Sequence, residues 1–587
     1  METSLQPADV VVLGTGAAAL ASAITAAHAG LRVVMLERDD CVGGTSAVSG
    51  GALWIPMSRQ AREAGVADSP DEVRRYLRQV LGEGYRAEII DSFLRNGPEA
   101  LAFLEQHGGL RYALRPLSPD YYSDFPGATD AGRVLEMGEF DGRLLGTWFE
   151  KLRPPLRGLM GFGGMMVNKA DVAHFMRMRR SFGSMLHMAR LTARFLRDRL
   201  RHSRGTRLVI GNAMVAALLK SALDLGVQIH LRHRTTRFVV DDDGAVTGVE
   251  ATGPDGRPHR FIAHRGVVLG TGGLSRRPGV EADRPGSRAD HRSLAAPLAG
   301  GSMIGLAQRQ LGAALGDAHL RGNFYWAPMS VASAGGRDEV FPHIMLDRAR
   351  PGIIAVDDRG ERFVNEANSY HRFVQAMLAR QQQGAKHFHL IADARALAEH
   401  GLGLVRPRPG LRGRWLMDRY LVEAPSVVAL ARRLDIAPDA LQKTVDDFNV
   451  GAALGVDPRF HRGESSYDRA MGDPSAPYPN LAPLLEAPFY AVRVVTGDLG
   501  SAKGLVTDGH ARVLRPGGQV IGGLYAVGTD MNSAVSGTYP GPGIVLGTGV
   551  TFGYVAGRTI AAGITASEPA APTSQAVRLS GERHGFA

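Results

Sequence analysis

A glycine-rich turn near the start of the chain has the residue types and spacing that bind a dinucleotide. Gly14 and Gly16 fall in GTGAAA, between the apolar segment Asp9–Leu13 and an alanine-rich segment. Such a turn brings backbone N–H groups at the start of a helix against a pyrophosphate. Glu37 ends the next apolar segment, Leu31–Glu37, where an acid can bind a ribose hydroxyl. These residues therefore predict a strand, a helix and a second strand that bind an adenine dinucleotide.

A second loop separates FAD from the nicotinamide dinucleotides. Cys41–Gly51 reads CVGGTSAVSGG and directly follows the second predicted strand. Small residues and hydroxyl groups let a backbone wrap around a long cofactor, and FAD continues beyond its pyrophosphate through the ribityl chain to the isoalloxazine. A nicotinamide enzyme does not need this loop. The predicted FAD contacts in this part of the chain are Gly14, Gly16, Ala17, Ala18, Glu37, Arg38, Gly44, Thr45, Ser46, Ser49, Gly50 and Gly51.

Two further glycine-ended strands are predicted far along the chain. Gly266–Gly273 (GVVLGTGG) follows a predicted hairpin over Thr235–Thr252, and Gly523–Asp530 (GLYAVGTD) lies near the C-terminus. The apolar helix predicted over Ile544–Ile560 can direct its first N–H groups at the flavin pyrimidine edge, where reduced flavin gathers negative charge. These segments add Thr271, Gly272, Thr529, Asp530, Ile544 and Leu546 to the predicted FAD contacts.

The spacing of these strands predicts the domain organisation. The fold class is α/β, with a discontinuous Rossmann-type FAD-binding domain and an inserted α+β catalytic domain. The predicted FAD-binding domain comprises residues 1–285 and 488–566. Residues 286–487 form the predicted catalytic domain, and residues 567–587, rich in Ala, Ser, Pro and Thr, form a predicted flexible tail.

Composition excludes several other classes of protein. Of 587 residues, 44% are hydrophobic, so the chain can form a core and is not disordered throughout. A single cysteine excludes a disulfide framework and cysteine-based metal sites, and no metal site is predicted. The net charge of +10 comes mostly from dispersed arginines, which do not predict nucleic-acid binding. We find no signal peptide and no apolar run of about 18 residues, so we expect a cytoplasmic protein.

The motifs resemble those of a known family. GTGAAALASAITAAHAG, ERDDCVGGTSAVSGG, GLYAVGTD and TYPGPGIVLG are similar to segments of the flavoproteins related to fumarate reductase and succinate dehydrogenase. Within that group the chain most resembles the 3-ketosteroid (3-oxosteroid) dehydrogenases, over about residues 8–565. The resemblance implies noncovalent FAD and a Rossmann-type domain interrupted by a catalytic domain.

The resemblance also points to three tyrosines. Fumarate reductases carry an arginine proton donor shortly after a segment like Arg362–Glu366 (RFVNE), and here that position holds Tyr370. The ketosteroid dehydrogenases have tyrosines in this stretch, in the YPGPG motif matched by Tyr539–Gly543, and in a PDY segment. In the PDY segment Tyr121 is the favoured match, and Tyr122 is the alternative.

The implied reaction is desaturation of steroid ring A between C1 and C2. The Tyr539 hydroxyl and the Gly543 N–H would bind the C3 carbonyl oxygen, Tyr370 would remove the C2 proton with help from Tyr121, and flavin N5 would take the C1 hydride. The implied partners are a steroid-like apolar substrate and an electron acceptor that the sequence does not identify. The alternatives are a ketosteroid 4(5α)-dehydrogenase, a fumarate or urocanate reductase acting on another enone or an acidic substrate, and a flavin-binding protein without turnover.

Two other segments invite more than one interpretation. The aromatic segment Phe324–Pro328 is suited equally to a substrate wall and to a core. Met176–Arg201 predicts a helix that could cover the active site, contact a partner or lie on an anionic membrane. Its apolar residues are Met185, Met188, Leu191, Phe195 and Leu196, and its basic residues are Arg177, Arg179, Arg180, Arg190, Arg194, Arg197 and Arg199.

Overall fold

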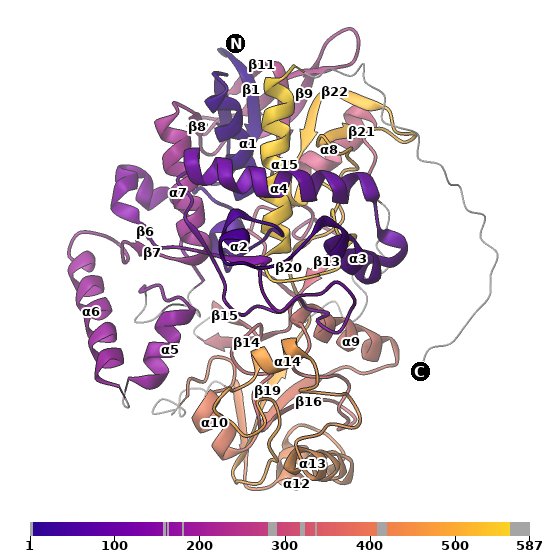
Figure 1. The fold of residues 1–587 in the computed structure, drawn as a ribbon. Coiled ribbons are helices and arrows are strands. Elements are labelled where there is room, and N and C mark those ends of the chain that lie inside the picture. Colours follow the sequence, from indigo (N-terminus) through magenta and orange to yellow (C-terminus); the bar gives the residue numbers. More distant parts are fainter. Residues whose placement is uncertain are drawn as a thin grey trace, which may run out of the picture.

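The two ends of the described chain lie together at one end of an elongated molecule, as Figure 1 shows. The computed structural model describes residues 4–563 except 157–159, 161–163, 179–180, 280–289, 317–322, 335–336 and 408–418. The predicted tail over 567–587 and the predicted boundary at 285/286 therefore lie outside the described residues.

An eight-stranded sheet joins the three glycine-ended strands. Its main path has the order β21-β22-β11-β1-β2-β8, with β10 and then β9 attached beside β11. Strand β11 pairs in parallel with β1 on one side and with β22 on the other. The predicted adjacency of these distant segments is thus confirmed. The bounds are β1 Ser4–Leu13, β2 Val33–Leu36, β8 Gln228–His230, β9 Arg234–Val240, β10 Val246–Thr252, β11 Pro258–Leu269, β21 Arg512–Leu514 and β22 Val520–Ala526.

Two helices made of small residues pack closely beside this sheet. Helix α1 (Ala17–His28) and helix α15 (Ile544–Ala561) are in contact along their lengths. A Cβ added at Gly553 would lie 2.3 Å from the Ala18 carbonyl oxygen, so glycine is required for this approach. Contrary to our expectation of no span-length apolar run, α15 is long and apolar enough to cross a membrane, but 78% of that stretch is buried in the protein.

A four-stranded antiparallel sheet forms the other end of the molecule. Its order is β16-β17-β19-β18, with one core cluster on each face. Strand β19 pairs with β17 and β18, although the predicted boundary placed it in the second FAD-binding segment, so this sheet extends beyond residue 487. The bounds are β16 Ile353–Asp357, β17 Phe388–Ala392, β18 Leu421–Ala424, β19 Phe489–Val494, α9 Tyr370–Gln382, α10 Ala394–His400, α12 Val427–Arg433, α13 Pro438–Ala453 and α14 Ser466–Met471.

Further strands and helices lie outside these two sheets. They are β3 Leu53–Trp54, α2 Arg59–Glu63, α3 Pro70–Leu81, α4 Ala87–His107, β4 Tyr112–Leu114, β5 Val134–Met137, β6 Phe140–Asp141, β7 Arg207–Leu208, α7 Ile210–Asp224, β12 Arg292–Ser293, α8 Ser302–Leu311, β13 Phe324–Trp326, β14 Met329–Ala334, β15 Arg337–Pro342 and β20 Gly497–Ser501. Helix α4 packs across α15.

The basic segment contains two helices instead of the predicted one. Helix α5 (Lys169–Arg177) ends inside the segment, and α6 (Phe182–Arg199) begins after Ser181, whose hydroxyl accepts the Ser184 N–H at 3.3 Å. This cap satisfies an N–H group that has no acceptor inside the helix. Arg179 and Arg180 lie outside the described residues. The predicted apolar face is divided, because Met188 and Phe195 pack inward against Met165 in a small core.

Candidate active site

The glycine-rich turn and the second loop meet at the start of α1. Gly14 has a φ of +94°, and an added Cβ would lie 2.3 Å from the Gly270 carbonyl oxygen at the end of β11. Gly16 precedes the helix, and the only atom an added Cβ there would meet is Oγ of Ser46, at 3.5 Å. The Ala17 N–H donates to this same oxygen at 3.1 Å. The N-terminus of α1 is therefore bare enough for an anion, with Ser46 beside it.

Glu37 is held beside this turn by two donors. The Thr15 hydroxyl donates to one carboxylate oxygen at 2.6 Å, and the Asp39 N–H donates to the other at 3.0 Å. Burial raises the pKa of Glu37, although both hydrogen bonds oppose that rise. Each carboxylate oxygen keeps further acceptor capacity for a ribose hydroxyl, as the motif predicts.

Asp530 joins the ends of β11 and β22. Its carboxylate accepts the Thr271 N–H at 2.5 Å, the Thr271 hydroxyl at 2.7 Å and the Gly273 N–H at 2.8 Å. The side chain is fully buried. Asp530 therefore shapes the turn that contains the predicted contacts Thr271 and Gly272, and its own contact with the ribityl chain stays a prediction.

The other loop residues divide into two groups. Gly44 and Gly50 would meet nothing within 4 Å if they carried a Cβ, so their backbone is open to a ligand. Gly51 instead approaches helix α7, where an added Cβ would lie 2.4 Å from the Ile210 carbonyl carbon. The remaining contacts tie the loop to the protein: Arg38 donates to the Leu298 carbonyl, Thr45 accepts the Ala296 N–H at 2.9 Å, and Ser49 donates to the Ser46 carbonyl at 2.7 Å.

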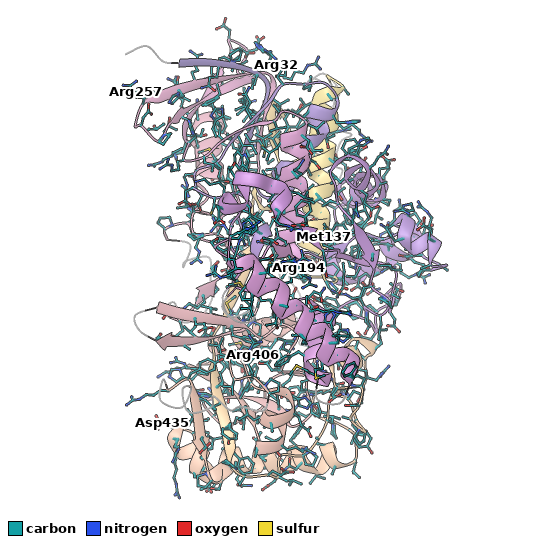
Figure 2. The ribbon with its side chains drawn as sticks, turned by 90° about the vertical axis from the view of Figure 1, so that its left-hand side faces the viewer. Arg32, Met137, Arg194, Arg257, Arg406 and Asp435 are labelled. Carbon is teal, nitrogen blue, oxygen red and sulfur yellow. The ribbon has the colours of Figure 1, made fainter. Side chains whose placement is uncertain are left out.

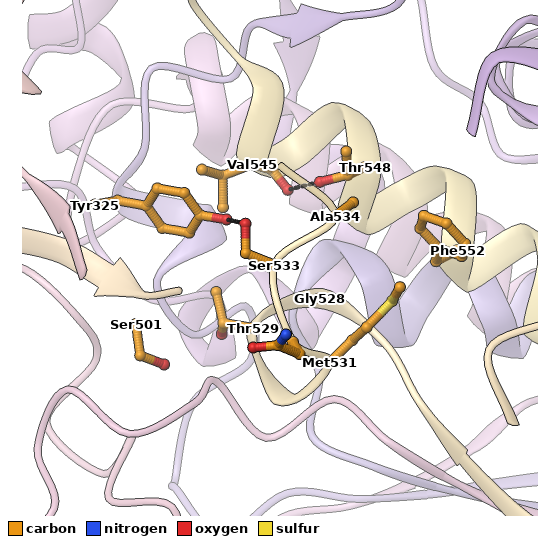
Figure 3. Close-up of a pocket in the computed structure, with 11 residues that line it drawn as sticks. Tyr325, Ser501, Gly528, Thr529, Met531, Ser533, Ala534, Val545, Thr548 and Phe552 are labelled. Carbon is orange, nitrogen blue, oxygen red and sulfur yellow. Dashed lines mark hydrogen bonds between the residues drawn. The ribbon is translucent and has the colours of Figure 1, made fainter. Parts of the chain in front are cut away.

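A pocket lies where the turn after β22 faces the first turns of α15 (Figure 3). It is lined by Tyr325, Ser501, Gly528, Thr529, Met531, Asn532, Ser533, Ala534, Val545, Thr548 and Phe552. Of the predicted residues nearby, Thr529 lines it directly, while Ile544 is buried and Leu546 is partly buried against the main core. Open glycine backbone, a helix N-terminus beside it and a carboxylate with spare acceptor capacity are features that FAD needs, so the residues present fit this cofactor.

Three predicted tyrosines meet in one buried cluster. The ring centroids of Tyr121 and Tyr370 are 5.6 Å apart, those of Tyr121 and Tyr539 are 5.5 Å apart, and those of Tyr370 and Tyr539 are 5.3 Å apart. They come from the turn after β4, the first position of α9 and the loop before α15. Tyr122 lies outside this cluster, against Phe125 at 5.2 Å, which favours Tyr121 of the two candidates.

Two further tyrosines belong to the cluster: Tyr325, from the aromatic segment Phe324–Pro328, and Tyr467, which no sequence motif indicated. Tyr467, in α14, has its ring 4.9 Å from that of Tyr121. Tyr325, in β13, has its ring 5.6 Å from that of Tyr539, and its hydroxyl donates to Ser533 at 2.8 Å. The flanking Phe324 and Trp326 pack into the core of the four-stranded sheet, so this part of the aromatic segment has the core role, and its role as a substrate wall stays a prediction. Only the tertiary fold brings Tyr467 here, since no motif surrounds it.

Burial makes these hydroxyl groups weak acids. It raises the pKa of Tyr539 to about 12, although hydrogen bonding with Tyr370 opposes the rise. Burial also raises the pKa values of Tyr121 and Tyr370 well above their usual value, and hydrogen bonding with Tyr370 lowers that of Tyr121. The acidities of the three phenols are therefore coupled to one another.

A buried ion pair fixes the turn that carries Tyr121. Asp120 accepts hydrogen bonds from Arg133 at 2.7 Å and from the Trp54 indole at 2.8 Å. Immediately afterwards, the Tyr121 N–H donates to the Pro540 carbonyl at 2.9 Å. This last bond joins the PDY turn directly to the YPGPG loop, so two segments more than 400 residues apart have one fixed geometry.

A second buried ion pair anchors the segment before Tyr370. Glu366, in the RFVNE segment, pairs with Arg362 at 2.7 Å and with Arg462 at 3.0 Å. Arg362 also pairs with Asp457 at 2.7 Å. The ion pairs hold the pKa of Glu366 down to about 2, against the effect of burial. The RFVNE segment therefore acts structurally, by holding the start of α9.

Replacing Glu366 by glutamine should destabilise the protein by about 3–5 kcal/mol at neutral pH, because the buried Arg462 loses its carboxylate partner and the buried Arg362 loses one of its two. The folded-state pKa is depressed, so the stabilisation is complete above the ordinary value of 4.5 and is lost as the pH falls toward about 2. Denaturation midpoints measured against pH should therefore flatten in this range in the variant. Glu464→Gln, at a side chain 63% exposed, is the control and should change neither quantity; equal effects of the two variants would contradict the assignment.

Comparisons with known proteins identify the family to which the chain belongs. Residues 9–546 match the family model described as an FAD binding domain. The chain is 36% identical to the 4-oxocyclohex-2-ene-1-carboxylate 5-dehydrogenase of Sinomonas cyclohexanicum, over 94% of this chain and 93% of the relative. It is 35% identical to the 3-oxosteroid 1-dehydrogenase of Mycolicibacterium smegmatis, over 96% of this chain and 98% of the relative.

A solved structure has the same fold over nearly the whole chain. The 3-ketosteroid delta1-dehydrogenase from Sterolibacterium denitrificans, in complex with 1,4-androstadiene-3,17-dione, is 32% identical with a TM-score of 0.87, covering 95% of this chain and 100% of that chain. FAD is therefore the cofactor, and the protein is an oxidoreductase acting on CH–CH groups. The chain belongs to the family of FAD-binding oxidoreductases that includes the 3-oxosteroid 1-dehydrogenases.

Proposed function

We propose that the protein desaturates a six-membered ring ketone next to its carbonyl group, and that the substrate is a 3-ketosteroid oxidised between C1 and C2. The observation that carries this proposal is the buried cluster of Tyr121, Tyr370 and Tyr539 beside the loop that leads into α15. Such a cluster supplies neutral hydrogen-bond donors and a proton acceptor in an apolar site, and ketone desaturation requires both.

Each protein group has one task in this reaction. The Tyr539 hydroxyl and the Gly543 N–H bind the carbonyl oxygen and stabilise the negative charge that develops on it. Gly543 has a φ of +91° and precedes α15, whose first N–H groups lack acceptors inside the helix. Tyr370 accepts the proton from the carbon next to the carbonyl, and Tyr121 shares that proton by hydrogen bonding. FAD, when bound without a covalent link, supplies the hydride acceptor.

The second candidate substrate is a smaller ring ketone that carries a carboxylate. Its support is the relative named as a 4-oxocyclohex-2-ene-1-carboxylate dehydrogenase, which is about as similar to this chain as the steroid enzymes. Both candidates share the six-membered ring ketone. A 4(5α)-dehydrogenase is a further alternative on the same steroid. Reduction of fumarate or urocanate is disfavoured by Tyr370, which stands at the arginine position of fumarate reductases.

Anaerobic mixing of the yellow holoenzyme with a substrate panel tests the proposal. The panel comprises 4-androstene-3,17-dione, a 5α-3-ketosteroid and 4-oxocyclohexanecarboxylate. Rapid bleaching of the flavin by a steroid, with a product unsaturated between C1 and C2, is the expected result. Bleaching by the carboxylate alone would replace the steroid by the second candidate, and bleaching by no ring ketone would overturn the proposal.

We also propose that the enzyme is cytoplasmic and contacts an anionic membrane through α6. Figure 2 shows this helix on the face turned to the viewer, with Arg194 labelled. Phe182 and Leu196 on α6 and Leu200 just after it are 75%, 60% and 83% exposed. The helix also carries four arginines, while its single acid, Asp198, is buried and accepts the Thr206 N–H. Exposed apolar side chains beside cations suit an anionic lipid surface, where an apolar substrate also dissolves.

The protein should therefore sediment with vesicles containing anionic lipid and much less with neutral vesicles, since each arginine near the surface contributes about 1 kcal/mol. Replacing both Leu196 and Leu200 by glutamate should abolish the binding. The matched control is Leu454→Glu, an apolar side chain 69% exposed at the end of α13, which should bind as before. Binding unchanged in the double variant would contradict the contact.

A further inference from the structure

A buried arginine lies next to the tyrosine cluster, outside the groups assigned to the carbonyl oxygen and the substrate proton. Arg348 lies in the turn between β15 and β16 and is 1% exposed. Its guanidinium donates to the His343 carbonyl at 2.9 Å and to the carbonyls of Glu366 and Asn368. The last two bonds hold the turn that leads directly into Tyr370. Backbone carbonyls satisfy the donors of this group without neutralising its charge.

The side-chain carboxylate of the neighbouring Asp347 forms its hydrogen bonds with groups other than the Arg348 guanidinium. Asp347 accepts His343 Nδ1 at 2.6 Å and the Gly403 N–H at 2.9 Å, and from Arg348 it accepts only the backbone N–H, at 2.8 Å. Burial lowers the pKa of Arg348, and the nearby Tyr467, Asp347, Tyr121 and Asp468 oppose that effect. Two of these four neighbours are tyrosines of the cluster, so the charge of Arg348 acts on the phenols.

The interaction reaches the cluster through Tyr467. Burial raises the pKa of Tyr467 to about 12, and the charge of Arg348 together with a hydrogen bond from it opposes that rise. Asp468 acts in the opposite direction, and Arg115 assists Arg348. The Tyr467 ring lies 4.9 Å from that of Tyr121, which is hydrogen-bonded to Tyr370. Arg348, Tyr467, Tyr121 and Tyr370 therefore form a continuous series of contacts.

We propose that Arg348 is a positioning residue that holds Tyr370 in place and stabilises negative charge on the tyrosine cluster, so that the cluster can accept the substrate proton. The inference rests on the proposed function. In the reaction a C–H bond next to the carbonyl breaks, its proton goes to the Tyr370 oxygen, and its electron pair becomes the enolate held by Tyr539 and Gly543. A nearby buried cation favours the ionised phenol that must receive this proton.

Arg348→Met and Arg348→Lys test the proposal in the FAD-loaded enzyme. Loss of the charge should raise the apparent pKa of the ascending limb, over which the flavin-reduction rate rises with pH, by about 1–2 units, and slow reduction at neutral pH by about 10–100-fold. Arg348→Lys retains the charge but loses the planar fork. It should keep the pH midpoint near that of the wild type while reacting more slowly. A Met variant with an unshifted midpoint would overturn the proposal.

Arg462→Gln is the matched structural control. Arg462 is also fully buried, binds the Ile353 and Arg350 carbonyls at 2.7 and 2.8 Å, and anchors the same segment through Glu366. Its ion-pair partner is a carboxylate and no tyrosine, so this variant should lower stability without moving the pH midpoint. An equal shift in both variants would assign Arg348 a purely structural role and overturn the proposal.

A spectroscopic titration separates failure of this inference from failure of the proposed function. Near-ultraviolet absorbance of the holoenzyme follows tyrosinate formation without any substrate. Arg348→Met should move a tyrosine ionisation to higher pH, and the same change in a Tyr467→Phe background should move it much less, because the coupled partner is gone. If no ring ketone bleaches the flavin but this shift occurs, the electrostatic role stands and the substrate is wrong. If no shift occurs, the inference fails whatever the substrate.

Discussion

Replacing Tyr370 by phenylalanine should slow flavin reduction by a ring ketone by about 10²–10⁴-fold, the usual contribution of a positioned proton acceptor. The change removes one oxygen from a ring that is otherwise packed against Tyr121 and Tyr539. FAD content and the unfolding midpoint should change little, because the ring keeps its contacts and loses only its hydroxyl. Rapid mixing under anaerobic conditions measures the rate directly.

The control for this variant is Tyr122→Phe. Tyr122 is as buried as Tyr121 but packs against Phe125 and beneath Arg372, outside the cluster. Its loss of a hydroxyl should leave the rate within about threefold of the wild type, whereas Tyr121→Phe should slow it. If Tyr370→Phe reduced the flavin as fast as Tyr122→Phe, Tyr370 would not be the base.

Replacing Tyr539 by phenylalanine should slow the same step by about 10²–10³-fold, as the loss of one donor to a developing oxyanion does. Because this hydrogen bond strengthens as the carbonyl oxygen gains charge, kcat and kcat/KM should fall together. Burial holds the pKa of Tyr539 at about 12, so the hydroxyl stays protonated and can donate at neutral pH. Steady-state kinetics across the substrate range measures both constants.

The tyrosine variant is a cleaner test than a change at Gly543. A Cβ at Gly543 would lie 2.5 Å from the Ala52 carbonyl oxygen, and its φ of +91° disfavours any other residue, so Gly543→Ala would disturb the loop as a whole. Tyr325→Phe is the better comparison. It removes a hydroxyl that already donates to Ser533 at 2.8 Å, and should affect the rate much less. Equal losses in the two variants would argue against a specific role for Tyr539.

Local motifs identified the cofactor-binding half of the protein. The turn at Gly14, the helix that follows it and the strand that ends at Glu37 lie within about thirty residues. Their relative positions therefore follow from short-range geometry. The same reasoning placed β11 and β22 beside β1, because strands that end in glycine-rich turns share one edge of a parallel sheet. It was less accurate at Met176–Arg201, where a capping serine divides one amphipathic pattern into two helices.

The catalytic half depended on resemblance and then on tertiary contacts. Motifs around Tyr370 and Tyr539 were recognisable, but nothing near Tyr467 or Arg348 in the sequence indicates that they meet the cluster. The sequence also did not indicate the structural role of Asp530. Its position suggested a cofactor contact, which stays a prediction, and the fold shows that its carboxylate bridges two strand ends. Side chains that are far apart in the sequence and meet only in the folded protein produce no periodicity or fixed spacing by which the sequence could reveal them.

The sequence by itself therefore determined the cofactor and the family, because each is specified by short segments whose backbone geometry is local. It also pointed to Tyr370, Tyr539 and the Tyr121/Tyr122 pair as candidate site residues. The tertiary structure decided which groups surround those tyrosines and what sets their acidity. Tyr121, Tyr370, Tyr467 and Tyr539 come from four separate parts of the chain, and Arg348 comes from a fifth. Their burial and electrostatic coupling are properties of the packed protein, since charge interactions act through space over a few ångströms and not along the sequence.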